Sequence, residues 1–205
     1  MIAKMRNGGE ACTAANRLYV QRGAAAEFSR LLTEKMSALK VGAGVNVDTD
    51  VGPLVNAAAV NKVSELVDDA VSRGAKVLCG GKRADNAGLF FPPTVLLDVP
   101  LDAAIAHDEI FGPAAPIYLF DTEEEAINLA NQTEHGLVAY VYTSDLERGL
   151  PVCERIEAGM VALNRGLVSD PAAPFGGVKQ SGLGREGAHH GMQEFMEDKY
   201  IAVGW

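Results

Sequence analysis

Stretches with helical and strand-like hydrophobic spacing alternate along this chain, and that alternation limits the folds open to it. Apolar residues recur at helical spacing over 24–39 and 56–73, and Gly74 is well placed to end the second helix. Residues 76–79 and 94–97 have the composition of short strands. Helices between strands predict an α/β domain with a largely parallel sheet.

The second half of the chain continues this pattern. Thr122 is expected to begin a helix with three glutamates in its first turn, where the helix dipole favours acidic side chains. Residues 137–143 are rich in β-forming side chains, 145–157 have helical spacing, and 160–163 indicate a short buried strand. Residues 199–205 are β-prone, and a strand at a chain end needs a partner.

Composition indicates an ordinary globular domain. A chain of 205 residues can bury one substantial core, and 48% apolar with 22% charged residues is usual for soluble proteins. The net charge of −9 argues against nucleic acid and anionic membranes as partners. No apolar run approaches the ~18 residues of a membrane span, and no signal-peptide pattern opens the chain.

The cysteines and histidines indicate neither disulfides nor a metal site. Three cysteines cannot all pair, and their spacing fits no zinc motif. Cys79 and Cys153 fall in an expected strand and an expected helix, where packing roles are favoured. His189 and His190 are adjacent, so their side chains diverge on a helix. The expectation is no metal and a reducing, cytoplasmic location.

Cys12 is the candidate nucleophile. Gly8, Gly9 and small neighbours leave its surroundings open, and Arg6 and Arg17 flank it. Only the thiolate is strongly nucleophilic, and a positive flank favours the ionised form. The alternative is a buried structural cysteine, and these residues alone leave both interpretations open.

A glycine-rich segment follows far down the chain. Four glycines lie within 176–184, too many for a helix or a central strand, and Phe175 stands at the mouth of the segment. A flexible linker would combine glycine with serine, whereas here glycine alternates with valine, leucine and arginine. The composition therefore predicts a packed loop.

Five short motifs, in this order, together resemble the aldehyde dehydrogenase superfamily along the length of the chain. They are Gly9-Glu10-Ala11-Cys12, Gly52-Pro53-Leu54, Glu109-Ile110-Phe111-Gly112-Pro113, Asn164 after Gly159-Met160-Val161, and Pro174-Phe175-Gly176-Gly177 with Ser181-Gly182 and Gly184-Arg185-Glu186.

The resemblance implies a fold, a cofactor and a chemistry. Residues 1–198 would form the Rossmann-like catalytic domain, and 199–205 a strand that joins a neighbouring subunit in a homo-oligomer. Cys12 would attack an aldehyde to give a thiohemiacetal and then a thioester. Glu109 would bind the nicotinamide ribose of NAD or NADP, and Phe111 would contact the nicotinamide.

Within the family, the sequence is most similar to succinate-semialdehyde dehydrogenases. Gly166-Leu167-Val168-Ser169 and Arg6 are typical of that branch, in which these two positions bind the substrate carboxylate. Arginine suits this task because its planar fork grips a carboxylate through two charge-assisted bonds, and Ser169 adds a hydroxyl donor. The resemblance also implies Phe175 as a substrate-binding residue. A surface arginine and a turn serine are the plainer alternatives for Arg6 and Ser169, and glutarate semialdehyde remains open as substrate.

The sequence also departs from the family pattern. Glu10 stands where glutamine is common, and a carboxylate pointing inward there would raise the pKa of the Cys12 thiol. The cofactor-binding domain, the glutamate base and the oxyanion-hole asparagine of the family have no match in the sequence. A catalytic-domain fragment that is inactive alone is therefore expected, and the alternative function is a non-catalytic α/β fragment that only folds or associates.

Overall fold

The computed structural model describes residues 1–83 and 88–205, and the chain divides into two compact units, 1–132 and 133–205. The expected α/β class with a largely parallel sheet is confirmed, and the largely parallel sheet lies in the first unit. The assignment of residues 1–198 to one catalytic domain stays a prediction.

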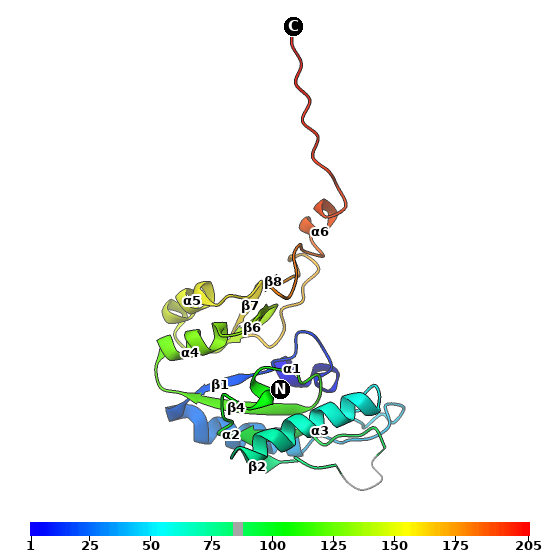
Figure 1. Ribbon diagram of the computed structural model, residues 1–205, viewed down its shortest axis with the longest axis vertical. Helices are drawn as coiled ribbons and strands as arrows, with labels where there is room; N and C mark the ends of the chain where they lie inside the picture. The colour runs from blue at the N-terminus through cyan, green and yellow to red at the C-terminus, as the bar shows by residue number, and fades with distance from the viewer. Residues whose placement is uncertain (84–87) are drawn as a thin grey trace. The chain divides into compact units, whose positions relative to one another are not determined.

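The first unit is built on a four-stranded sheet (Figure 1). Its strand order is β1 (Leu18–Gln21), β4 (Ala114–Phe120), β3 (Thr94–Leu97) and β2 (Lys76–Cys79). Strands β1, β4 and β3 are parallel, whereas β2 runs antiparallel to β3.

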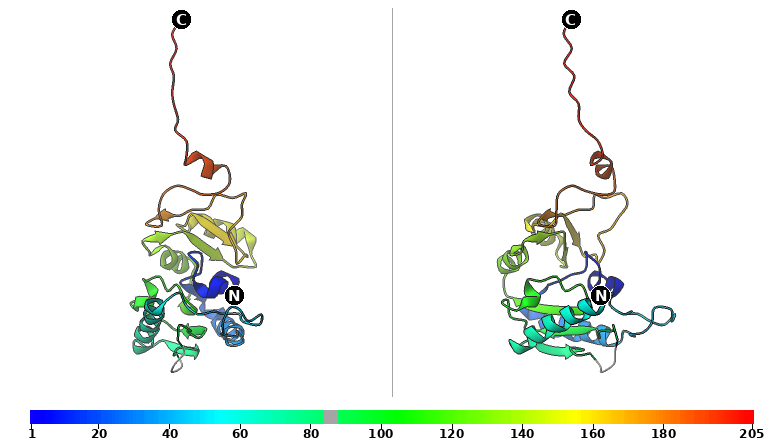
Figure 2. Two further views of the ribbon diagram at one scale, coloured as in Figure 1. Left: turned by 90° about the vertical axis from the view of Figure 1, so that its right-hand side faces the viewer. Right: turned by 45° about the vertical axis from the view of Figure 1, so that its right-hand side comes forward.

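Helices α2 (Arg22–Ser37) and α3 (Ala57–Ser72) cover opposite faces of this sheet (Figure 2). The two faces alternate along each strand, as the pleat requires. Val95 and Ile117 pack with α2, and their strand neighbours Leu96 and Tyr118 pack with α3. The result is a three-layer unit with a buried cluster on each face of the sheet.

The boundaries of α3 follow from its caps. The Asn56 side chain accepts a hydrogen bond from Ala59 N at 2.9 Å, and Gly74 adopts φ 111° beyond the last turn. Such a positive φ is one that glycine adopts without a Cβ penalty, so the expected role of Gly74 is confirmed. The remaining helices of the first unit are α1 (Ile2–Met5), η1 (Arg6–Gly9), η2 (Ala104–Ala106) and α4 (Glu123–Asn131). Thr122 caps α4 as expected, accepting from Glu125 N at 3.2 Å.

The second unit contains two small strand pairs. Strands β6 (Val138–Val141) and β7 (Met160–Leu163) are parallel, and β5 (His135–Gly136) and β8 (Val178–Lys179) are antiparallel. Its helices are α5 (Leu146–Arg155) and α6 (His190–Gln193).

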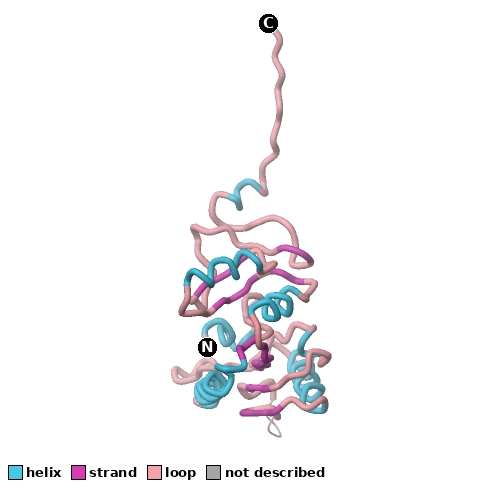
Figure 3. Tube along the Cα trace, turned by 90° about the vertical axis from the view of Figure 1, so that its left-hand side faces the viewer, coloured by secondary structure: helices cyan, strands magenta, loops and turns pink. Residues whose placement is uncertain are grey.

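Residues after α6 form no regular element and are drawn as loop in Figure 3. Every residue of 199–205 is exposed. The oligomerisation strand expected there stays a prediction, since a lone strand needs a partner.

The central strand β4 was not expected from the sequence, and neither was β1. Strand β4 begins Ala114-Ala115-Pro116, and both alanine and proline are uncommon inside strands. Burial explains the difference, because residues 114–118 are buried between the two helices. Small side chains there let the helices approach, so packing outweighs local propensity.

Candidate active site

Cys12 lies on the exposed loop between η1 and β1. The backbone that leads to Cys12 has positive φ at Asn7, Gly8 and Gly9, with values of 51°, 64° and 86°. A turn around the cysteine is closed by Ala14 N, which donates to Ala11 O at 2.8 Å. The thiol is therefore presented to solvent on an ordered turn, and the alternative of a buried structural cysteine is wrong.

Gly9 brings the Cys12 segment against the segment that holds Glu109. A Cβ built on Gly9 would overlap the carbonyl of Gly112, so only glycine allows this approach of the two backbones. The two motifs lie about a hundred positions apart in sequence, and the first unit places them in contact.

Asn16 joins the same two segments through hydrogen bonds. Its Nδ2 donates to Asp108 O at 2.9 Å, and its Oδ1 accepts from Ile110 N at 2.8 Å. One side chain thus binds the backbone on both sides of Glu109. The sequence did not predict this role, because an asparagine four residues after Cys12 carries no distinctive signal.

Glu109 and Phe111 occupy this bound segment. Glu109 is exposed, and Phe111 is half-buried with a backbone φ of 48°. A left-handed conformation costs a bulky residue roughly 1–2 kcal/mol, so the surrounding contacts must hold Phe111 in place. Strain of this kind is often found at ligand sites.

Lys4 lies buried beneath this region, with only 3% of its surface exposed. Burial lowers the pKa of the Lys4 ammonium to about 7, and the negative charge of Glu109 opposes this shift. The sequence did not predict this site, because nothing in the neighbouring residues distinguishes a buried lysine from a surface one.

Glu10 points to a neighbouring loop. Its Oε1 accepts a hydrogen bond from Val55 N at 3.2 Å. The carboxylate faces a hollow of about 110 Å³ between residues 7–10 and 50–54. Glu10 therefore serves to join the Cys12 loop to the Gly52-Pro53-Leu54 motif.

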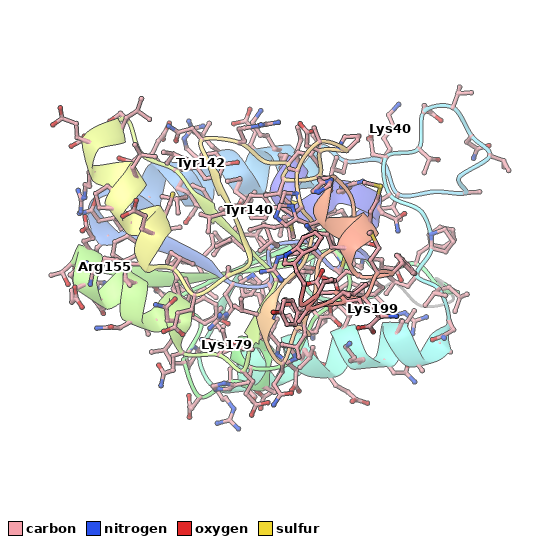
Figure 4. The ribbon with its side chains drawn as sticks, turned by 90° about the horizontal axis from the view of Figure 1, so that it is seen from above. Lys40, Tyr140, Tyr142, Arg155, Lys179 and Lys199 are labelled. Carbon is pink, nitrogen blue, oxygen red and sulfur yellow. The ribbon has the colours of Figure 1, made fainter. Side chains whose placement is uncertain are left out.

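Lys40 lies at the start of the loop that leads into that motif and binds the residues at its other end (Figure 4). Its Nζ lies 3.1 Å from Asp48 Oδ2, and its backbone N donates to Asp50 Oδ2 at 2.9 Å. These contacts fix residue 50 and, through it, the side of the hollow opposite Glu10.

Arg17 is bound to the end of a helix. Its guanidinium donates to Leu129 O at 3.3 Å and to Ala130 O at 3.2 Å, and it lies over the ring of Tyr19. A cation at a helix C-terminus stabilises the last carbonyls. Arg17 thus holds α4 against β1, a role that the sequence did not predict.

The predicted carboxylate ligands belong to different units. Arg6 is exposed in the first unit, and Ser169 is half-buried in the second. Phe175, also half-buried in the second unit, exchanges two backbone hydrogen bonds of 2.8 Å with Glu186. Convergence of Arg6, Ser169 and Phe175 on Cys12 stays a prediction.

The glycine-rich segment forms a packed loop, as expected. Ser181 Oγ accepts from Gly136 N at 2.9 Å, and Arg185 Nη1 donates to Gly177 O at 2.8 Å. A Cβ at Gly176 would meet the carbonyl of Gly184 at 2.6 Å. Position 176 therefore requires glycine for close backbone packing within the second unit.

The other two thiols are less accessible than Cys12. Cys79 at the end of β2 and Cys153 in α5 are half-buried, and all three cysteines are free. Burial raises the pKa of the Cys153 thiol. The expected packing roles of Cys79 and Cys153 agree with these positions.

Two kinds of feature are absent from the part of the chain that the structure describes. No group of three or more histidine, cysteine, aspartate or glutamate side chains there could hold a metal ion. Nor is any helix in residues 1–83 and 88–205 long and apolar enough to cross a membrane.

The model of the aldehyde dehydrogenase family matches residues 1–201. The chain belongs to the aldehyde dehydrogenase family. Members of this family are NAD(P)-dependent oxidoreductases.

The similar proteins include semialdehyde dehydrogenases. A succinate-semialdehyde dehydrogenase of Paenarthrobacter nicotinovorans is 53% identical over 99% of this chain and 45% of its own length. A glutarate-semialdehyde dehydrogenase of Pseudomonas putida is 48% identical over 99% of this chain and 42% of its own length. The crystal structure of an aldehyde dehydrogenase from Brucella melitensis biovar abortus superimposes with a TM-score of 0.95 at 50% identity, over 98% of this chain and 41% of that one. The chain thus spans less than half the length of these relatives.

Proposed function

We propose that this chain is the catalytic portion of an NAD(P)-dependent dehydrogenase that oxidises succinate semialdehyde to succinate. The observation that carries the proposal is the junction of the Cys12 and Glu109 segments by Asn16 and by the Gly9–Gly112 approach. A nucleophile and a cofactor-binding carboxylate are thereby held in one compact unit.

In the proposed reaction, the Cys12 thiolate attacks the aldehyde carbon and forms a thiohemiacetal. The backbone N–H of Cys12 is the donor proposed for the resulting oxyanion. Loss of hydride from the former aldehyde carbon leaves a thioester on Cys12, and water then releases the acid and the thiolate. The nicotinamide cofactor, when bound, supplies the acceptor for this hydride.

Glu109 and Phe111 fit a cofactor of this kind. An exposed carboxylate can accept hydrogen bonds from both hydroxyls of a ribose, and the backbone on either side of Glu109 is fixed. Phe111, held in a left-handed conformation, offers an aromatic side chain two residues away. NAD and NADP are both compatible with these residues.

The proposed substrate carries a carboxylate beyond its aldehyde. Arg6 and Ser169 are the proposed ligands for it, with Phe175 at the mouth of the site. Similarity to both a succinate- and a glutarate-semialdehyde dehydrogenase supports a dicarboxylic semialdehyde as the substrate class.

A chimaera tests the function. This chain would replace the matching 45% of the Paenarthrobacter nicotinovorans relative, whose remaining part supplies the rest of the family fold. We expect the chimaera to oxidise succinate semialdehyde with NAD or NADP and Cys12→Ser to abolish turnover. The 205-residue chain alone should show no significant turnover, because the family's glutamate base and cofactor-binding domain have no match in it. General-base catalysis by itself typically contributes about 10²–10⁴-fold. A folded but inactive chimaera would favour the alternative, a non-catalytic fragment that only folds or associates.

The substrate assignment is tested by Arg6→Ala in the same chimaera. A charge-assisted bond to an anion is worth roughly 1.5–3 kcal/mol, so kcat/KM for succinate semialdehyde should fall about 10–100-fold. Butanal, which has the same carbon number and no charge, should be much less affected. Arg22→Ala is the matched control, because Arg22 forms an exposed pair with Asp121 on another part of the unit. Equal losses for both aldehydes would assign Arg6 to loop structure instead.

A further inference from the structure

We propose that Asn16 is a positioning residue for Glu109, so that cofactor binding depends on the segment that carries the nucleophile. The inference rests on the proposed function, in which Glu109 binds the cofactor ribose. Asn16 lies four residues after Cys12 and would not itself touch the cofactor.

The Asn16 side chain forms hydrogen bonds through both its amide nitrogen and its amide oxygen. The carboxamide uses its donor on Asp108 O at 2.9 Å and its acceptor on Ile110 N at 2.8 Å. These two groups belong to the residues immediately before and after Glu109. Fixing the peptides on both sides limits how the Glu109 backbone can rotate, and hence where its carboxylate points.

The rest of the segment is constrained from the same direction. Ile110 is fully buried, and Gly112 lies against Gly9. Phe111 between them keeps a left-handed φ of 48°. Asp108 N also donates to Ala104 O at 2.9 Å, so both ends of residues 108–110 are held. Without Asn16, the Asp108 carbonyl and the Ile110 N–H would lose their bonds to its side chain, and the peptides on either side of Glu109 would be freer to rotate. The strain at Phe111 would then favour a shift of the segment.

The bridge also links two steps of the chemistry. Cys12 and Asn16 lie on one continuous stretch before β1, and Glu109 lies on the other side of the bridge. The hydrogen bonds of Asn16, together with the Gly9–Gly112 contact, therefore hold the Cys12 segment and the Glu109 segment at a fixed spacing. A change at Asn16 should alter cofactor affinity before it alters the reactivity of the thiol.

The first test uses the 205-residue chain itself. Asn16→Ala removes the acceptor of the Ile110 N–H, so amide exchange at Ile110, measured by NMR, should become at least about 10-fold faster. Asn56→Ala is the matched control, because it also removes an asparagine that accepts from a backbone N–H, at the start of α3. In that variant Ile110 should exchange as in the wild type. Equal exchange in all three proteins would overturn the proposal.

The second test measures the dissociation constant of reduced cofactor by fluorescence titration of the chimaera. We expect Asn16→Ala and Glu109→Ala each to weaken cofactor binding. The loss for Asn16→Ala should be about 10-fold, because two ordinary hydrogen bonds are removed and only part of their free energy affects the ligand. The double variant should bind no more weakly than Glu109→Ala alone, because Asn16 acts through Glu109.

The outcomes separate the two claims. If Glu109→Ala weakens binding and Asn16→Ala does not, or if the two losses multiply, the positioning role of Asn16 is wrong and the proposed function stands. If Glu109→Ala leaves binding unchanged, the cofactor role of Glu109 fails, and the inference about Asn16 fails with it.

Discussion

The two units hold their candidate site residues by different means. In the first unit, one buried apolar cluster lies on each face of a four-stranded sheet, and hydrogen bonds join the Cys12 segment to the Glu109 segment. Among residues 133–205, all of which the structure describes, Ala162 is the only buried apolar side chain. There, Ser169 and Phe175 lie on long loops held by backbone hydrogen bonds and closely packed glycines.

This difference indicates which parts of the site are preformed. Burial of apolar surface is the main stabilising contribution in a folded unit, so the first unit can fix its own loops. The second unit leaves large apolar side chains exposed, including Tyr142, Leu146 and Leu150. We therefore expect Cys12 and Glu109 to keep their geometry under conditions in which the loops that carry Ser169 and Phe175 do not.

The largest effect should come from the core of the first unit. Leu96 in β3 is fully buried, so Leu96→Ala should lower the free energy of unfolding by about 2–5 kcal/mol through lost transfer energy and a cavity. Leu150→Ala in α5, where the side chain is 60% exposed, should change it by no more than about 0.5 kcal/mol. Urea denaturation followed by circular dichroism measures both. Similar losses would mean that the two units do not differ in this way.

The buried Lys4 should make stability depend on pH. The unfolded lysine keeps its proton up to its ordinary pKa of 10.5, whereas folded Lys4 has a pKa of about 7 and loses its proton there. Between these values the unfolded chain binds more protons, so rising pH favours the folded state, by up to about 1.4 kcal/mol per pH unit. The cost of burying Lys4 is fully present below pH 7 and disappears above 10.5.

Lys4→Met should therefore reduce the slope of unfolding free energy against pH between about pH 7.5 and 9.5 by that amount. Lys199→Met, in the exposed tail of the second unit, is the matched control and should leave the slope unchanged. An unchanged slope in Lys4→Met would show that folding does not lower the pKa of Lys4.

Much of the fold could be predicted from local pattern. Strands β2, β3 and β7 and the caps of α3 and α4 follow from residue type and spacing. Strand β4 could not be predicted, because its alanines and Pro116 suit a strand only when helices press on both faces of the sheet.

The candidate site divides in the same way. Cys12, Glu109 and Phe111 stand in short motifs that the sequence displays. Asn16 bonds to backbone about a hundred positions away, and Lys4 lies where the charge of Glu109 acts on it. A single sequence carries no sign of such long-range relations.

A smaller effect is expected at Tyr118. Its hydroxyl is buried and finds no hydrogen-bond partner among the described residues, and burial raises the pKa of the phenol far above its ordinary value. Tyr118→Phe should therefore raise the free energy of unfolding by about 1 kcal/mol, because an unpaired buried polar group is removed. Tyr142→Phe in the second unit, 62% exposed, should have no measurable effect. A marked loss of stability in Tyr118→Phe would reveal a partner for that hydroxyl.

The most direct test of the central claim is the reactivity of the three thiols in the folded 205-residue chain. Brief iodoacetamide treatment followed by mass spectrometry gives the alkylation rate at each cysteine, and the same treatment in urea gives the unfolded reference. We expect Cys12 to be alkylated first in the folded chain, because its loop presents the thiol while Cys79 and Cys153 are half-buried, and we expect the three rates to converge in urea. Preferential alkylation of Cys79 or Cys153 in the folded chain would contradict the claim that the first unit presents Cys12 as its nucleophile.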